Sequence, residues 1–180
     1  VIDSINWFFS EEEQGIILED DCLPSNSFFS FCENLLNYYA DNPKIMQING
    51  TNLDVNYNDN FPHSYFFSKF NHVWGWATWR RAWQLFDENF ENYENVKTQG
   101  KILEYFEDKI IANWMMKYFD AAYHKKDNIW SSNWAYTILK HNAFCATPSK
   151  NLVKNIGFDG SGTSGKARQF KEYSNTMLHE

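Results

Sequence analysis

Three consecutive carboxylates, Glu19, Asp20 and Asp21, directly follow the apolar run at 16–18. Neighbouring like charges repel one another, and a carboxylate beside an apolar segment is costly to desolvate. A hard cation such as Mg²⁺ or Mn²⁺ would relieve both costs, because it binds one or two carboxylates and leaves positions for water and phosphate oxygens. The triplet is therefore a candidate metal site. The alternative is a solvated acidic turn ahead of a helix.

The spacing within the triplet divides its side chains into two sets. Side chains alternate along an extended segment, so Glu19 and Asp21 are expected on one side and Asp20 on the other. One set would then hold the cation, while the remaining carboxylate would accept a hydrogen bond from a hydroxyl group.

Tryptophan is concentrated in the segment HVWGWATWRRAW, residues 72–83. The positions of Trp76, Trp79 and Trp83, at i, i+3 and i+7, predict one face of a helix. Packing in the core is the alternative interpretation for Trp79 and Trp83.

Gly75 lies between two of these indoles, which indicates a close approach of the backbone to another group. Trp74 and Trp76 flank that approach, and aromatic faces beside carboxylates are typical of sugar-binding sites. Arg80 and Arg81 are candidates for contact with phosphate, or for a solvated helix face.

A third aromatic and polar cluster is NIWSSNW, residues 128–134. It offers Trp130 and Asn133 as candidate substrate contacts, and Gly50, which ends the segment KIMQING, is a further candidate. Ser131 or Ser132 is a candidate N-cap of the following helix. The five histidines have no metal-binding spacing, and the sequence contains no phosphate-binding glycine loop and no nucleophile elbow.

The elements that would position these residues follow a strand–helix–strand order, which favours an α/β fold with a mostly parallel sheet and flanking helices. A helix is expected over about 1–12, a strand at 16–18, a helix beginning at Ser25 or Ser27, and a strand in KIMQING that ends at Gly50. Further expectations are a loop over 51–70, helices at 78–86 and 102–123, a strand at 143–148 and a loop over 151–167.

The composition limits the class of protein. A length of 180 residues predicts a single domain over 1–180, and a formal net charge of −7 argues against sequence-independent nucleic-acid binding. No apolar run reaches the length of a membrane span, and no signal peptide is evident. Three scattered cysteines favour buried apolar roles in a reducing compartment, so a cytoplasmic location is expected.

Four segments carry a family resemblance: GIILEDDCLPSNSFFSFC, KIMQING, HVWGWATWRRAW and NLVKNIGFDGSGT. Together they resemble bacterial glycosyltransferase-like proteins of the nucleotide-diphospho-sugar transferase (GT-A) fold, a family 2-like group of which some members bear the name hemolytic protein. The layout is similar to that of N-acetylglucosaminyltransferase I. The resemblance covers about residues 1–165. It implies that the strand–helix units which bind the nucleotide base would precede Val1, in keeping with a chain that begins inside a helix.

The resemblance implies roles for matching positions. Asp21 would be the direct ligand of Mn²⁺ or Mg²⁺, Glu19 and Asp20 would contact the ribose or sugar of the donor, and the segment at 75–76 would lie under the transferred sugar. Ser131 stands where relatives have an aspartate suited to act as general base, with Asp127 as a substitute.

Ser164 likewise stands where relatives often have a histidine that would contact the metal or a phosphate. The function implied is inverting, metal-dependent transfer of a sugar from a nucleotide-diphosphate donor to a glycan or glycoconjugate acceptor. The alternatives are a carbohydrate-binding module without turnover and an interaction scaffold in which the triplet is solvated.

Overall fold

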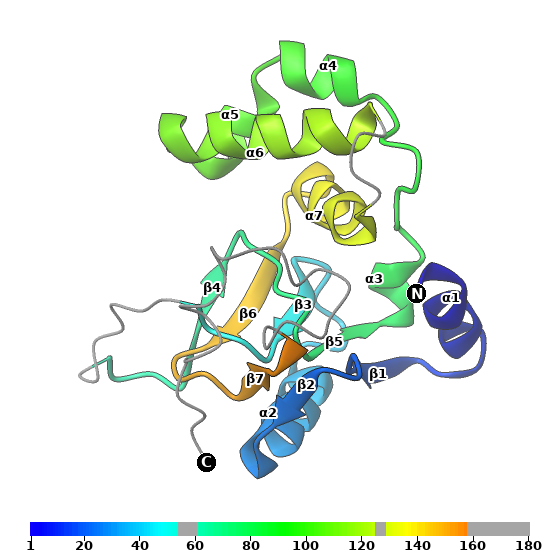
Figure 1. Cartoon of the computed structure of the whole chain (residues 1–180), viewed down its shortest axis with the longest axis vertical. Coiled ribbons are helices and arrows are strands. Elements are labelled where there is room, and N and C mark those ends of the chain that lie inside the picture. The colour runs from blue at the N-terminus through cyan, green and yellow to red at the C-terminus, as the bar shows by residue number, and fades with distance from the viewer. Residues whose placement is uncertain (54–60, 125–128, 158–180) are drawn as a thin grey trace.

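The computed structural model describes residues 1–53, 61–124 and 129–157 (Figure 1). The described chain is a mixed α/β structure built on a five-stranded sheet in the order β1-β5-β3-β6-β4. A smaller sheet pairs β2 with β7 in antiparallel register. The strands are β1 (Gln14–Ile17), β2 (Cys22–Pro24), β3 (Ile45–Asn49), β4 (Tyr65–Ser68), β5 (Trp76–Trp79), β6 (Phe144–Pro148) and β7 (Val153–Asn155).

Helices occupy both faces of the larger sheet. They are α1 (Ile2–Glu11), α2 (Asn26–Tyr38), α3 (Arg80–Trp83), α4 (Tyr93–Thr98), α5 (Lys101–Phe106), α6 (Lys109–Tyr123) and α7 (Trp130–Lys140). Within the described ranges, no helix is both long and apolar enough to cross a bilayer, in agreement with the predicted absence of a membrane span.

The expected mostly parallel sheet is wrong. Among the described strands, β3 and β6 form a parallel pair, while β1–β5, β3–β5 and β4–β6 are antiparallel. The strand–helix–strand pattern nevertheless holds in part, because β5 is antiparallel to both of its neighbours and so β1 and β3 run in the same direction. Helix α2 thus connects two strands of like direction between which β5 is inserted. A local pattern cannot reveal that insertion, since β5 comes later in the sequence.

The tryptophan segment forms a strand where a helix was expected. Trp76 and Trp79 bound β5, and only 80–83 are helical. Side chains alternate along a strand, so residues three positions apart point to opposite faces of the sheet. Trp76 accordingly packs in the cluster formed with α1, α3 and α7, whereas Trp79 packs in the cluster under α2. The three tryptophans therefore do not share one face, and Trp79 and Trp83 pack in the core.

Other elements follow the sequence prediction with local exceptions. Helices α1 and α2 and strands β3 and β6 are confirmed, and Ser25 is the N-cap of α2. Three predictions are incomplete. Strand β4 lies within the expected loop at 51–70, and strand β7 lies within the expected loop at 151–167. The expected single helix at 102–123 is divided into α5 and α6. The break occurs where Glu107 has a φ of 59° and the Asp108 side chain accepts hydrogen bonds from Ile110 N and Ile111 N, which starts α6.

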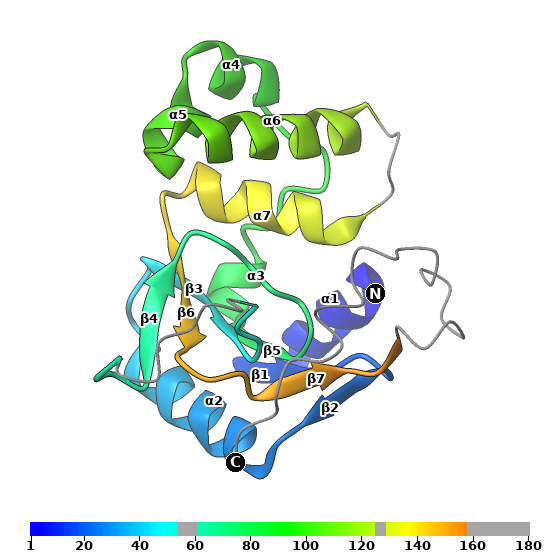
Figure 2. The same cartoon turned by 60° about the vertical axis from the view of Figure 1, so that its left-hand side comes forward.

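The elements form layers (Figures 1 and 2). Helix α2 covers one face of the sheet, and α1, α3 and α7 cover the other. Helices α4, α5 and α6 pack on the far side of α7 and share with it a third apolar cluster, which includes Ile102, Phe119 and Tyr136. The sheet and α2 thus support the segment that carries the acidic triplet.

Both arginines after β5 serve the fold. Arg81 lies at the end of α2, where its guanidinium donates to the carbonyl oxygens of Ala40, Tyr39 and Ile45 at 2.6, 2.8 and 3.1 Å and lies 4.4 Å from the Trp79 ring centroid. Arg80 forms an ion pair with Glu13 at 2.8 Å. Neither side chain is thus left free to serve as a phosphate contact.

Arg81→Lys is expected to lower the free energy of unfolding by about 1 to 3 kcal/mol, because one ammonium group cannot reach three carbonyl oxygens and cannot stack as a planar guanidinium does. Arg80→Lys is the matched control and is expected to cost under about 1 kcal/mol, since Glu13 is exposed. Urea denaturation of both variants checks the difference, and equal losses would contradict the prediction.

Candidate metal and sugar site

The acidic turn, residues 19–22, connects β1 to β2. Cys22 N donates to the carbonyl oxygen of Glu19 at 3.1 Å, which closes the turn. The backbone of Asp21 is fixed from the other side, since Ile156 N donates to its carbonyl oxygen at 2.8 Å. A Cβ atom at Gly157 would collide with Asp21 Oδ2, so the carboxylate lies against the backbone that follows β7. Two segments far apart in sequence thus hold Asp21.

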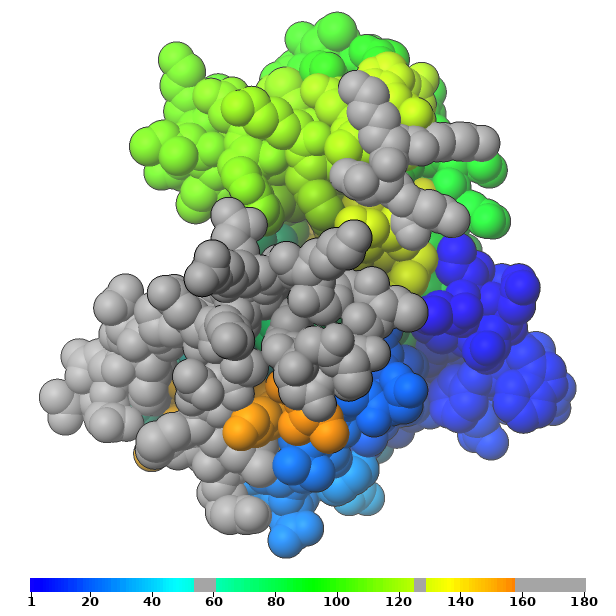
Figure 3. Space-filling model, viewed as in Figure 1, coloured from blue at the N-terminus to red at the C-terminus, as the bar shows by residue number. Residues whose placement is uncertain are grey.

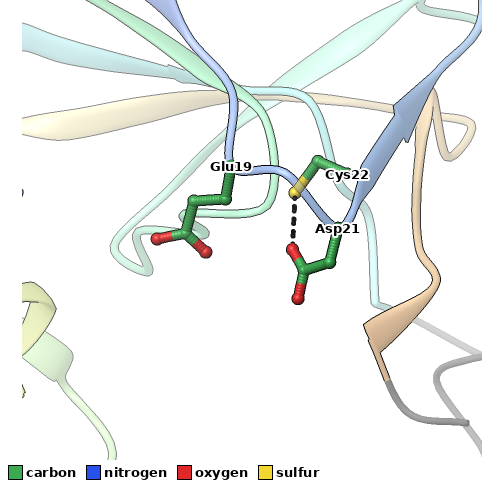
Figure 4. A group of neighbouring side chains, drawn as sticks. All are labelled: Glu19, Asp21 and Cys22. Atoms are coloured by element: carbon green, nitrogen blue, oxygen red, sulfur yellow. Dashed lines mark hydrogen bonds between the residues drawn. The ribbon is translucent and has the colours of Figure 1, made fainter. Parts of the chain in front are cut away.

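The side chains of the turn differ in exposure in the expected sets, although residues 20 and 21 form a turn and not the expected extended segment. Glu19 and Asp21 are half-buried and Asp20 is exposed. Potential ligand atoms of Glu19, Asp21 and Cys22 lie within 4.8 Å of one another, and Figure 4 shows these three side chains together. Cys22 was not identified from the sequence as part of this group, because the spacing between Cys22 and the other cysteines is not that of a metal site. Its position directly after the triplet was the available signal. The predicted burial of Cys32 and Cys145 is confirmed.

Negative charge accumulates in the turn. Burial raises the pKa of Glu19, and the charges of Asp21 and Asp20 raise it further. Burial also raises the pKa of Cys22 to about 12, with Asp21 contributing, so Cys22 is a neutral thiol at physiological pH. The anionic donors are therefore two carboxylates, which suit Mg²⁺ or Mn²⁺ better than a soft metal. Two oxygens bound to one Mg²⁺ lie about 3 to 4 Å apart. The possible ligand atoms lie within 4.8 Å of one another, and carboxylate oxygens are donors of the kind that Mg²⁺ and Mn²⁺ bind.

Two predicted substrate-binding glycines contact each other beside the acidic turn. Gly50 N donates to the carbonyl oxygen of Gly75 at 2.8 Å, and both residues are buried. Gly75 has a φ of 65°, and a Cβ atom there would meet Val153 at 2.7 Å and Leu18 at 3.1 Å. The loop before β5 is therefore packed against the residue that precedes Glu19. This contact brings the end of β3 next to the turn.

The predicted tryptophan contacts differ in exposure. Trp76 is 0% exposed, so its ring presents no face to a sugar, and only the backbone at 75–76 could lie under one. Its Nε1 has no hydrogen-bond partner among the described residues. Trp130 is half-buried and stacks on Trp76 with ring centroids 5.9 Å apart. Trp74 is also half-buried, and its carbonyl oxygen accepts from Thr51 Oγ1 at 2.6 Å. Trp74 and Trp130 are thus only partly buried.

The start of α7 carries no carboxylate that could act as a base. The Ser131 hydroxyl lies 3.5 Å from the Tyr118 hydroxyl. Asn133 donates to the carbonyl oxygens at 87 and 88, at 3.1 and 2.8 Å, so its amide holds that loop. Neither serine is the N-cap, because the helix begins at Trp130 and Ile129 is the cap residue. Asp127 and Ser164 lie outside the described residues.

His72 lies in the loop that joins β4 to β5. Its backbone is fixed by two buried amides, because Asn49 Oδ1 accepts from His72 N at 3.1 Å and Gln47 Nε2 donates to the His72 carbonyl oxygen at 2.8 Å. Burial lowers the pKa of His72 to about 4. The imidazole is consequently neutral at physiological pH.

Acidification from pH 6.5 to 4 is expected to destabilise the chain through His72, by at most about 3 kcal/mol. In this window the unfolded chain binds a proton that the folded chain does not, so the free energy of unfolding falls as the pH falls. Urea denaturation at several pH values measures the slope. His72→Gln should have a shallower slope than the wild type, and an identical slope would contradict the prediction.

Comparison with known proteins yields no matching family model and no matching curated protein.

Proposed function

We propose that this chain binds a nucleotide-diphosphate sugar through a divalent cation and transfers the sugar to a hydroxyl of a glycan or glycoconjugate acceptor. The observation that carries the proposal is the half-buried pair of carboxylates on Glu19 and Asp21, which directly follows a strand of the sheet. A divalent cation bound by both carboxylates would offset their mutual repulsion, and a cation of this kind leaves positions for diphosphate oxygens.

The fold assignment within this proposal is a nucleotide-diphospho-sugar transferase fold. It is supported by the resemblance of four segments and by the shared direction of β1, β3 and β6. The acidic turn, Gly50 and Gly75 belong to three of those four segments.

Each residue has a role that follows from its exposure. Asp21 and Glu19 would hold the cation, which on binding neutralises charge on the departing diphosphate. Asp20 is exposed and would accept a hydrogen bond from a ribose or sugar hydroxyl. Trp74 and Trp130 would offer their rings to the sugar, and the backbone at 75–76 would support it. The general base is not assigned to a described residue.

A carbohydrate-binding module without turnover is the second candidate. The observation that favours it is Ser131, which supplies no carboxylate at the start of α7 where the resemblance implies a base. Loss of a general base typically lowers a rate by about 10² to 10⁴. A binding module would keep the sugar contacts and would have no preference for a nucleotide.

Calorimetry separates the two candidates. UDP, GDP and free monosaccharides are titrated into the chain with Mn²⁺ and, in parallel, with a chelator. Nucleotide binding that requires Mn²⁺ is the result expected of a transferase donor site. Binding of free sugar in both conditions, without binding of either nucleotide, would favour the binding module over the transferase.

A further inference from the structure

One face of α6 exposes large apolar side chains together with lysines. Ile110 is 82% exposed and Trp114 is 61% exposed. Trp114 stacks on Tyr118 with ring centroids 6.0 Å apart and an interplanar angle of 4°. Exposed isoleucine and tryptophan one helical turn apart are costly in water. We call the set Lys109, Ile110, Trp114 and Lys117 the α6 ridge.

The charge of the α6 ridge is opposite to that of the whole chain. Lys109 and Lys117 are exposed and form no ion pair with a described residue. The nearby carboxylates have partners: Asp120 accepts from Lys97 at 2.6 Å and from the Tyr93 hydroxyl at 2.9 Å, and Glu107 pairs with Lys69 at 3.1 Å. Asp108, exposed beside Lys109, accepts from Ile110 N and Ile111 N. The ridge thus carries unpaired positive charge in a chain of net charge −7. Charges farther away than about 8 to 10 Å are screened at physiological salt, so the local charge decides what binds here.

The ridge protrudes from the molecule. Helix α6 lies in the helical part beyond α7, away from the sheet (Figures 1 and 2), and this helical part forms the upper part of the surface in Figure 3. A protruding row of apolar side chains suits a soft surface that can deform around it. Indole rings partition to the boundary between headgroups and acyl chains, and lysines can place their ammonium groups among anionic headgroups at the same depth.

We propose that the α6 ridge docks the protein on an anionic lipid surface, with Trp114 and Ile110 inserted at the boundary and Lys109 and Lys117 bound to headgroup phosphates. This attachment is peripheral and does not depend on the transferase proposal. The occupant is a lipid surface rather than an acidic protein because the apolar groups protrude and the positive charges flank them.

Another exposed tryptophan provides a matched control. Trp7 on α1 is 71% exposed, but Asp3 and Glu11, four residues before and after it, are both exposed on the same side of the helix. An anionic surface would repel that face. Trp7 and Trp114 are therefore the same residue type with similar exposure, but the charged side chains near Trp7 are negative and those near Trp114 are positive.

The test is flotation of the full chain with vesicles of phosphatidylcholine alone and with vesicles of equal parts phosphatidylcholine and phosphatidylglycerol. Binding is expected to the anionic vesicles only and should fall as NaCl is raised from 50 to 500 mM. Trp114→Ala should weaken binding about 10-fold or more. Lys109→Gln combined with Lys117→Gln should weaken it about 5-fold for each lysine. Trp7→Ala should leave binding unchanged. Circular dichroism confirms that each variant is folded.

Three results would overturn the proposal. One is an absence of wild-type binding to the anionic vesicles. Another is an equal loss of binding in Trp7→Ala and Trp114→Ala. The third is a dimer in solution that Trp114→Ala dissociates, without vesicle binding, which would assign the ridge to a second copy of the chain.

Discussion

Asp21→Asn is expected to lower the affinity of the chain for UDP or GDP in the presence of Mn²⁺ by about 100-fold or more. Replacement of a second-layer residue at a metal site typically costs 10- to 100-fold in metal affinity, and removal of a direct ligand should cost at least the upper part of that range. The backbone of Asp21 is fixed because Ile156 N, just after β7, donates to its carbonyl oxygen, and the carboxylate lies against Gly157, so another side chain cannot take its place without moving the turn.

Asp20→Asn is the matched control, since it removes the same charge from the neighbouring residue. Asp20 is exposed and lies outside the group formed by Glu19, Asp21 and Cys22, so we expect a loss of no more than about 5-fold, as for an exposed charge. Calorimetric titration of Mn²⁺ alone, and then of nucleotide, measures both steps. Equal losses in the two variants would indicate a general charge effect and not a ligand at position 21.

Gly50→Ala is expected to lower the free energy of unfolding by about 3 kcal/mol or more. The added Cβ atom would lie 2.5 Å from the Gly75 carbonyl oxygen, 2.5 Å from Phe28 and 2.7 Å from Val153. The first of these atoms belongs to the backbone and accepts a hydrogen bond from Gly50 itself, so it cannot move away without loss of that bond. Overpacking of a buried position typically costs about 1 to 3 kcal/mol, and loss of a buried hydrogen bond adds to that cost.

Gly100→Ala separates this steric cost from a conformational one. Gly100 has a φ of 72°, and a Cβ atom there would meet nothing within 4 Å. Its replacement should cost only about 1 kcal/mol, the price of a left-handed conformation in a residue other than glycine. Urea denaturation compares the two variants. A Gly50→Ala variant that is as stable as Gly100→Ala would show that the contact between Gly50 and Gly75 relaxes easily.

The amino-acid sequence by itself determined the elements whose pattern is local. The apolar face of α2, with Phe28, Cys32 and Leu36, follows from a 3.6-residue period, whereas the sequence left Ser25 and Ser27 open as its start and the structure places the cap at Ser25. This period depends on neighbours in the chain, so a single sequence contains the information needed to predict it.

Only the tertiary structure decided which strands pair and which distant residues meet. Strand β5 enters between β1 and β3, and this insertion makes the sheet mostly antiparallel although its first crossover has the predicted direction. It also converts the helical spacing of Trp76 and Trp79 into two opposite faces of a strand. The contact between Gly50 and Gly75, and the support of Asp21 by β7, join segments that are far apart in sequence. Such contacts form because one pairing of the strands buries more apolar surface than the alternatives. The free-energy difference between pairings is distributed over the whole core, so no single segment encodes it.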